Sequence, residues 1–248
     1  MNNPWELRSD DTRESDNLHT FLIFCEDETS ECEYFRFFET EKIKINIFPN
    51  RKNTIENVVK AISYCKQNGI IREDNDVVDG FEVWCVYDRD LFVGDSRFEE
   101  NKVRFNIASK AAESHKINVA WSNDAFELWI ILHLTDLDDI NNYKHRDIYY
   151  SYLDNYFKDK EDKSNRLQKI LAHGTFSYKK DLKSKKNFTE IVRNEIIPHT
   201  YVAIERSKRI ELIHKGKSDL TEWCPCTLVH NLVERLLDKG QKRIEYIT

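Results

Sequence analysis

The sequence predicts an α/β fold in which a parallel sheet is flanked by helices and followed by a mainly helical C-terminal extension. Two short, continuously apolar runs, 21–25 and 83–87, have the composition of strands that are buried on both faces. Amphipathic helical patterns alternate with such runs along the first half of the chain, which is the rhythm of a parallel sheet with crossover helices. From residue 136 onwards we find no segment with the pattern of a strand.

The first three elements follow directly from this alternation. A strand is predicted at 19–26, and a helix at 30–42 follows it. Ser30 and Glu33 have the spacing of a capping box, in which the first side chain caps the helix and the second bonds back to the cap. The second strand is predicted at 43–48.

The rest of the sheet is predicted from the same signals. The helix that we expect at 54–67 is closed by Asn68 and Gly69, a pair that favours a helix end. The later elements of this half are a strand at 81–87, a charged helix at 96–115, a strand at 117–121 and an apolar helix at 125–134.

Composition divides the chain into three parts. Residues 1–17 are polar and are predicted to be a flexible leader, residues 18–135 hold the predicted sheet, and residues 136–248 form the helical region. The last helix of that region is expected at 227–239. The stretch 179–186 is rich in lysine and is predicted to be an exposed turn.

Charge is distributed unevenly along the chain. The net charge is −6, but residues 1–140 hold 16 basic against 29 acidic side chains, whereas residues 141–217 hold 18 against 10. An acidic half beside a basic half is typical of a metal-dependent enzyme that acts on a polyanion such as a nucleic acid. Two solvated faces of opposite sign are the simpler alternative.

Membrane insertion and disulfide bonding are both disfavoured by composition. No apolar stretch approaches the roughly 20 residues that a membrane-spanning helix needs. The six cysteines are scattered, and the polar N-terminal stretch has no signal-peptide pattern. We therefore expect reduced cysteines and a cytoplasmic location.

Three acidic residues stand where two predicted parallel strands end. Glu26 ends the first apolar run, and Asp88 and Asp90 follow the second. The carboxyl ends of parallel strands are where α/β proteins bind their ligands, so the three carboxylates should meet at one edge. They would repel one another without a cation, and all-oxygen ligation selects a hard ion, so we expect Mg²⁺ or Mn²⁺.

These acids can be given roles in phosphodiester hydrolysis, in which a pair of divalent ions stabilises the attacking and leaving oxygens. Asp88 and Asp90 are two positions apart, so on a continued strand they would point to the same side. We expect Asp88 to bind a metal ion directly. Asp90 would make a second contact with the metal, either directly or through a water molecule. Glu26 would be a ligand or the general base.

Further site candidates come from the helix after the fourth strand and from the basic half. Glu127 is expected in the first turn of that helix beside the same sheet edge, and Asn123 precedes it by four residues. Either could bind a second ion or orient the other carboxylates, and Asn123 could bind the substrate. The alternative is that Asn123 simply caps the helix and Glu127 lies in its favourable first turn. Lys179 and Lys180 are the candidates for meeting the scissile phosphate, with a solvated loop as the alternative.

Four segments of the chain resemble motifs of RloB-like proteins and occur in the same order. They are 25–35 (CEDETSECEYF), 84–90 (WCVYDRD), 122–129 (SNDAFELW) with His133, and 225–229 (PCTLV). The resemblance runs from about residue 21 to residue 237, and Lys179 and Lys180 fall near a Tyr-Lys position that recurs in that family.

Two positions depart from the family pattern. Asp27 stands where the family usually has Gly after the first acidic residue, and Cys224 stands where Asn is usual. Glycine permits a tight turn or a positive φ, and Asp tolerates such a backbone better than most residues.

The resemblance implies a Toprim-like, that is Rossmann-like, sheet and a role in bacterial anti-phage defence beside an AAA-type ATPase partner. Together with the acids it predicts an effector nuclease that cleaves RNA, including tRNA, or DNA. The alternative is a regulatory or sensor subunit with a weak or inactive site, which Asp27 favours. The sequence leaves open the trigger and whether the chain forms a homo-oligomer.

Overall fold

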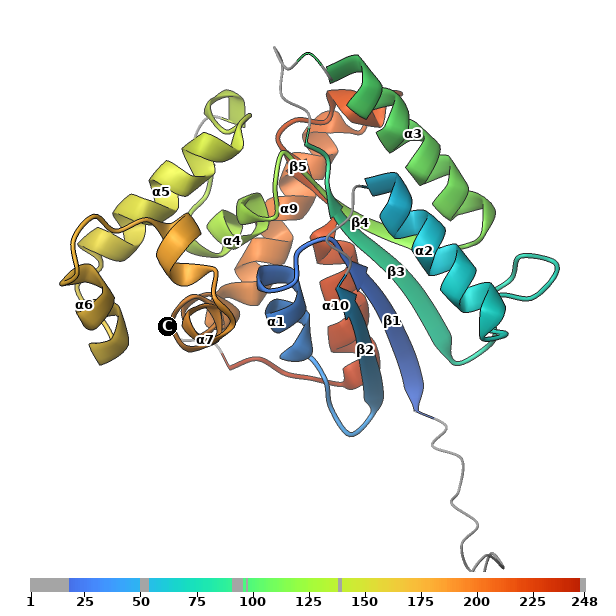
Figure 1. Cartoon of the computed structure of the whole chain (residues 1–248), viewed down its shortest axis with the longest axis horizontal. Coiled ribbons are helices and arrows are strands. Elements are labelled where there is room, and N and C mark those ends of the chain that lie inside the picture. Colours follow the sequence, from blue (N-terminus) through green and yellow to red (C-terminus); the bar gives the residue numbers. More distant parts are fainter. Residues whose placement is uncertain (1–17, 50–53, 91–95, 97, 138–139, 246–248) are drawn as a thin grey trace, which may run out of the picture.

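A computed structural model of the chain describes residues 18–49, 54–90, 96, 98–137 and 140–245. The leader predicted at 1–17 lies outside these residues. The described part contains a five-stranded sheet in the order β2–β1–β3–β4–β5 (Figure 1). The strands are β1 (His19–Cys25), β2 (Ile43–Pro49), β3 (Phe81–Asp88), β4 (Asn118–Asn123) and β5 (Cys226–Thr227).

The first four strands are parallel, as the alternating pattern predicts. β1 pairs with β2 on one side and with β3 on the other, and β3 pairs with β4. The apolar runs at the centre of β1 and β3 are buried because helices cover both faces of the sheet. Cys25 lies opposite Val86 in the register, so the residues that follow β1 and β3 emerge side by side.

Helices cover the sheet in two layers. α2 (Thr54–Gln67) and α3 (Phe98–Ser114) lie side by side on one face, and α1 (Ser30–Arg36) and α10 (Val229–Gly240) lie on the other (Figure 1). The apolar α4 (Glu127–Leu134) follows β4 and is almost entirely buried. α9 (Thr200–His214), a helix of the extension, packs against α4.

The extension is mainly helical, but it also contributes a strand. α5 (Arg146–Asp159) and α6 (Asn165–Leu171) lie beside the sheet, and shorter turns of α, 3₁₀ and π helix connect them to α9. β5 pairs antiparallel with β4, where Ser122 lies opposite Thr227. The expectation that no strand follows residue 136 is therefore wrong for Cys226–Thr227.

Two local expectations also differ from the structure. α1 ends at Arg36 rather than at residue 42, and no side chain caps its N-terminus, so the capping box of Ser30 and Glu33 is not formed. The stretch 179–186 is exposed at Lys179, Lys180 and 184–186, as expected, but it is not an irregular turn. It continues a turn of π helix (Tyr178–Leu182), in which Leu182 is buried. No helix in the described ranges is long and apolar enough to cross a membrane.

Candidate active site

Glu26 and Asp88 meet at the carboxyl edge of the sheet. Asp88 is the last residue of β3, and Glu26 follows β1 directly. The backbone N–H of Asp88 donates a hydrogen bond to Glu26 Oε2 at 3.2 Å. The side chain of Asp88 is held separately: its Oδ1 accepts a hydrogen bond from the backbone N–H of Phe126 at 2.8 Å. Phe126 directly precedes α4, so the start of that helix fixes the Asp88 carboxylate.

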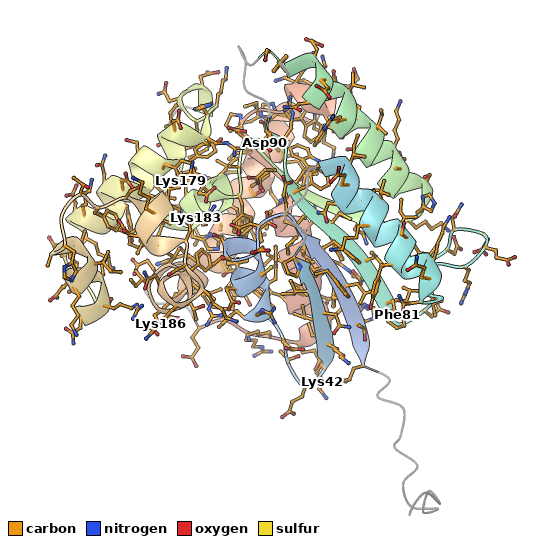
Figure 2. The ribbon with its side chains drawn as sticks, viewed as in Figure 1. Lys42, Phe81, Asp90, Lys179, Lys183 and Lys186 are labelled. Atoms are coloured by element: carbon orange, nitrogen blue, oxygen red, sulfur yellow. The ribbon has the colours of Figure 1, made fainter. Side chains whose placement is uncertain are left out.

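Asp90 lies at the same edge but in a different setting. In Figure 2 it stands at the opposite end of the sheet from Phe81, the residue that starts β3. β3 ends at Asp88, and Asp90 has a φ of 51°, so the expected same-side alternation of a continued strand does not apply. Asp90 is half exposed, and its carboxylate is ion-paired with Arg146.

Arg146, the first residue of α5, was not expected from the sequence to belong to this site. One terminal guanidinium nitrogen contacts Asp90 and lies 4.0 Å from Asp88 Oδ2. The same nitrogen lies 2.8 Å from Asp124 Oδ1, while Nε donates to Asp124 Oδ2 at 3.0 Å. Burial would lower the pKa of Arg146, but the hydrogen bond to Asp124 and the nearby carboxylates raise it above its ordinary value, so the group stays charged.

Glu31 supports the turn that follows β1. Its carboxylate accepts hydrogen bonds from the backbone N–H groups of Glu26 at 2.9 Å and Asp27 at 3.2 Å, and the residue is only 1% exposed. Burial, followed by the charges of Asp88 and Asp27, raises the pKa of Glu31 well above its ordinary value. Its place in α1 directly after the acidic turn was the sequence signal that could have indicated it.

A second basic residue, Lys183, reaches the cluster from the extension. Its Nζ lies 2.8 Å from Glu127 Oε1 and 3.3 Å from Asp27 Oδ2. Glu127 begins α4 and is 1% exposed, so this lysine compensates a buried carboxylate. Burial would lower the pKa of Lys183, but Glu127 and Asp27 raise it above its ordinary value.

The other basic and polar candidates make contacts of a different kind. Lys179 and Lys180 lie in the π-helical turn, where Lys179 Nζ stands 5.2 Å from the ring centroid of Tyr150 and Lys180 is exposed. Figure 2 places Lys179 and Lys183 in the same segment beside the sheet. Asn123 is 0% exposed, and its amide donates to the Trp223 carbonyl in the interior at 2.5 Å, so it cannot touch a substrate in this conformation.

The carboxylates at this edge are electrostatically strained. Burial, followed by the charge of Asp90, raises the pKa of Glu26 to about 8. Burial also raises the pKa of Asp88 well above its ordinary value, although the Arg146 charge works in the opposite direction. A cation placed between Glu26 and Asp88 would relieve this strain by favouring the ionised forms.

The donor set is suited to a hard metal ion, although the side chains are not arranged as a complete site. Glu26, Asp88 and Asp90 offer only carboxylate oxygens, the ligands that Mg²⁺ and Mn²⁺ prefer. Among the described residues, no three His, Cys, Asp or Glu side chains are grouped closely enough to share one ion. Arg146 accounts for part of this, because it already holds Asp90.

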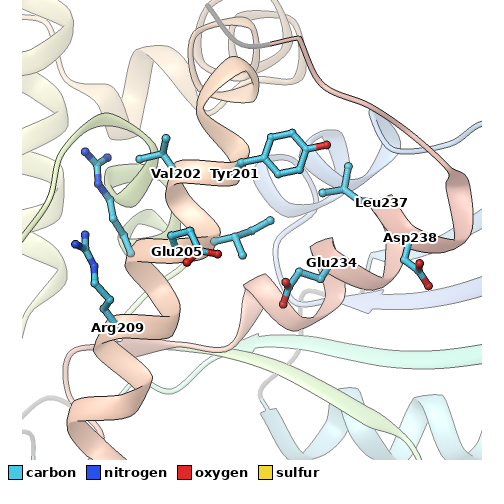
Figure 3. A pocket seen from close by; sticks show the side chains of 9 residues that line it. Tyr201, Val202, Glu205, Arg209, Glu234, Leu237 and Asp238 are labelled. Carbon is cyan, nitrogen blue, oxygen red and sulfur yellow. The ribbon is translucent and has the colours of Figure 1, made fainter. Parts of the chain in front are cut away.

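A cleft on another part of the molecule is lined by none of these acids. It lies between α9 and α10, has a volume of about 720 Å³, and carries Arg209 on one wall and Glu234 and Asp238 on the other (Figure 3). Arg209 is itself ion-paired with Asp136, and Glu234 with Lys208, so the charged groups of the cleft are largely neutralised within the protein. The carboxylates at the edge of the sheet, rather than this cleft, are therefore the candidate site.

The comparison with protein families gives a match over most of the chain. A family model described as RloB-like protein covers residues 21–236, which include the acidic residues at the carboxyl edge of the sheet. No curated protein and no solved structure matches the chain.

Proposed function

Because the chain belongs to the RloB-like protein family, we propose that it is a divalent-metal-dependent nuclease that acts as an effector in bacterial anti-phage defence. The observation that carries the proposal is the contact between Glu26 and Asp88 at the carboxyl edge of the sheet. Both carboxylates have raised pKa values, as expected for neighbouring acids in a partly buried site that has no cation to compensate their charge. A Toprim-like identity of the sheet is part of the same proposal.

Glu26 and Asp88 are the residues that would hold Mg²⁺ or Mn²⁺. When bound, such an ion polarises a phosphoryl oxygen and lowers the pKa of a bound water. Asp90 would join them only after releasing Arg146. Glu127 would act through Lys183, whose ammonium group it holds 2.8 Å away.

The side chains of the protein can supply the remaining needs of phosphodiester hydrolysis. Arg146 and Lys183 place two positive charges at the carboxylate edge, where they can face a phosphate. Burial raises the pKa of Glu26 to about 8, so its carboxyl group can give or take a proton near neutrality. Lys179 and Lys180, on the neighbouring turn, can bind flanking phosphates.

The basic composition of the extension favours a polymeric polyanion over a small phosphate ester. Residues 141–217 hold 18 basic against 10 acidic side chains, and α5 and the π-helical turn bring part of this segment to the carboxylates. RNA, including tRNA, and DNA are both candidates, because gripping of phosphates carries no sequence information.

A regulatory or sensor subunit is the second candidate, and a specific feature favours it. The acids at the edge are partly neutralised from within, Asp90 by Arg146 and Asp27 by Lys183. A protein of this kind could bind an AAA-type ATPase partner or a phage component without any catalysis.

Separate measurements of defence and binding distinguish the two candidates. If the chain is a nuclease effector, Glu26→Ala and Asp88→Ala abolish protection against phage while the variants still bind the partner ATPase. If it is a sensor, both variants protect as well as the wild type. The matched control is Glu41→Gln, a change at an exposed carboxylate outside the site.

A further inference from the structure

We propose that Arg146 is a fixed internal cation that occupies the position of a second metal ion, so that the carboxylate site takes up one divalent ion instead of two. This inference rests on the proposed metal-dependent function and adds a residue to it. It concerns the arginine at the start of α5 and its contacts with Asp88, Asp90 and Asp124.

The guanidinium of Arg146 is held rigidly by Asp124. Nε and one terminal nitrogen reach the two oxygens of the carboxylate at 3.0 and 2.8 Å, and the backbone N–H of Arg146 donates to Oδ2 at 3.1 Å. The terminal nitrogen also donates to the Asp124 carbonyl at 3.0 Å. Such a two-pronged pair fixes both the position and the plane of the guanidinium.

The burial of Asp124 makes this arrangement difficult to undo. Asp124 is 1% exposed, so withdrawing Arg146 would leave a carboxylate without its cation inside the protein. The ion pair between Arg146 and Asp124 is therefore a fixed part of the structure. From this fixed position, one terminal nitrogen of the guanidinium faces Asp88 and Asp90.

This position is the one that a second ion would need. An ion bridging Asp88 and Asp90 would lie where the terminal nitrogen of Arg146 already contacts Asp90 and stands 4.0 Å from Asp88. The same nitrogen lies 2.8 Å from Asp124 Oδ1, so the guanidinium already uses the three carboxylates that an ion at this position would meet. Glu26 and Asp88 are left as the carboxylates that can share one ion.

Lys183 interacts with the neighbouring acids in the same way. It neutralises Asp27 and Glu127 as Arg146 neutralises Asp90 and Asp124. Both cations come from the extension, whereas the acids belong to the part of the chain that precedes it, in the sheet, its adjoining turns and the start of α4. The extension thus supplies fixed positive charge and limits the ions that the sheet edge can accept.

Titration of the chelator-treated full chain with Mn²⁺, followed by calorimetry and by the spin-resonance signal of free Mn²⁺, tests the proposal. The wild type and Arg146→Lys should bind one ion. Arg146→Gln should bind Mn²⁺ about tenfold more tightly or take up a second ion, because a repelling charge about 4 Å from a ligand is gone. Arg209→Gln, at an exposed ion pair elsewhere, should match the wild type.

Asp90→Asn gives an independent reading if Arg146→Gln does not fold. An Asp90 engaged by Arg146 is not a metal ligand, so the Mn²⁺ affinity of this variant should stay within about threefold of the wild type. A loss of about tenfold or more, or an Arg146→Gln protein that binds Mn²⁺ like the wild type, would overturn the proposal. Failure of every protein, including Arg146→Gln, to bind Mn²⁺ would instead remove the metal-dependent function and this inference together.

Discussion

The backbone N–H of Asp88 donates a hydrogen bond to the carboxylate of Glu26 at 3.2 Å, although the two residues are 62 positions apart. The contact exists because β1 and β3 are adjacent parallel strands whose carboxyl ends emerge together. It places two acids with raised pKa values side by side, where a divalent cation would be bound most favourably.

Asp88→Asn should lower the metal-dependent cleavage rate by about 100-fold or more, because the central carboxylate ligand is lost. The measurement is the initial rate on a fixed nucleic-acid substrate at saturating Mn²⁺. Glu41→Gln, the exposed control, should keep the wild-type rate. An Asp88→Asn protein that cleaves normally would exclude the carboxylate edge as the active site.

The metal-free protein should become less stable as the pH rises toward about 8. The pKa of Glu26 is raised to about 8 in the folded chain, so the folded state holds a proton that the unfolded state has already lost. The stability from this proton is fully present below a pH of about 4.5 and is lost as the pH rises through about 8. Urea unfolding in chelator should show this decline, and Glu26→Gln should make it shallower. An unchanged pH profile in the variant would contradict the assignment.

The sheet and its acidic edge could be predicted because they depend on local patterns. The continuous apolar runs in β1 and β3 are typical of buried parallel strands. Glu26 and Asp88 stand where those strands end, so their position at the carboxyl edge could be predicted with the strands. β5 could not be recognised, because Cys226–Thr227 is only two residues long and pairs antiparallel at the edge.

The basic half of the site could not be predicted in the same way. Lys183 is one of five lysines within 179–186, and the local sequence does not distinguish it from the others. In the structure it follows the buried Leu182, and its ammonium group lies against Glu127. Arg146 reaches the edge because α5 packs against the sheet domain, which no local pattern reveals.

Lys183→Met should destabilise the protein by about 1–3 kcal/mol, since it leaves the buried Glu127 without its cation while Lys183 itself is partly exposed. Urea unfolding near neutral pH measures the change. The double variant Lys183→Met with Glu127→Gln should recover part of the loss, because no uncompensated charge remains. Lys180→Met, at an exposed lysine of the same segment, should change stability by no more than about 0.5 kcal/mol.

Lys179 and Lys180 should contribute to nucleic-acid binding through phosphate contacts. Changing both to Gln should weaken binding to RNA and DNA alike and reduce the slope of log affinity against log salt by about 1–2. Fluorescence anisotropy in chelator measures binding without cleavage. The pair Lys44→Gln with Lys60→Gln, at exposed lysines of β2 and α2, is the control. Equal salt slopes for the wild type and the Lys179, Lys180 variant would show that these lysines do not face the substrate.

The central claim is tested most directly by cleavage of pooled tRNA, other RNA and DNA with Mg²⁺ or Mn²⁺, comparing the wild type with Glu26→Ala, alone and with the ATPase partner. The account predicts metal-dependent cleavage of one of these substrates by the wild type, its loss in excess chelator, and its loss in Glu26→Ala. Cleavage that persists in excess chelator or in Glu26→Ala would contradict it, as would a wild type that cleaves none of the substrates even with its partner.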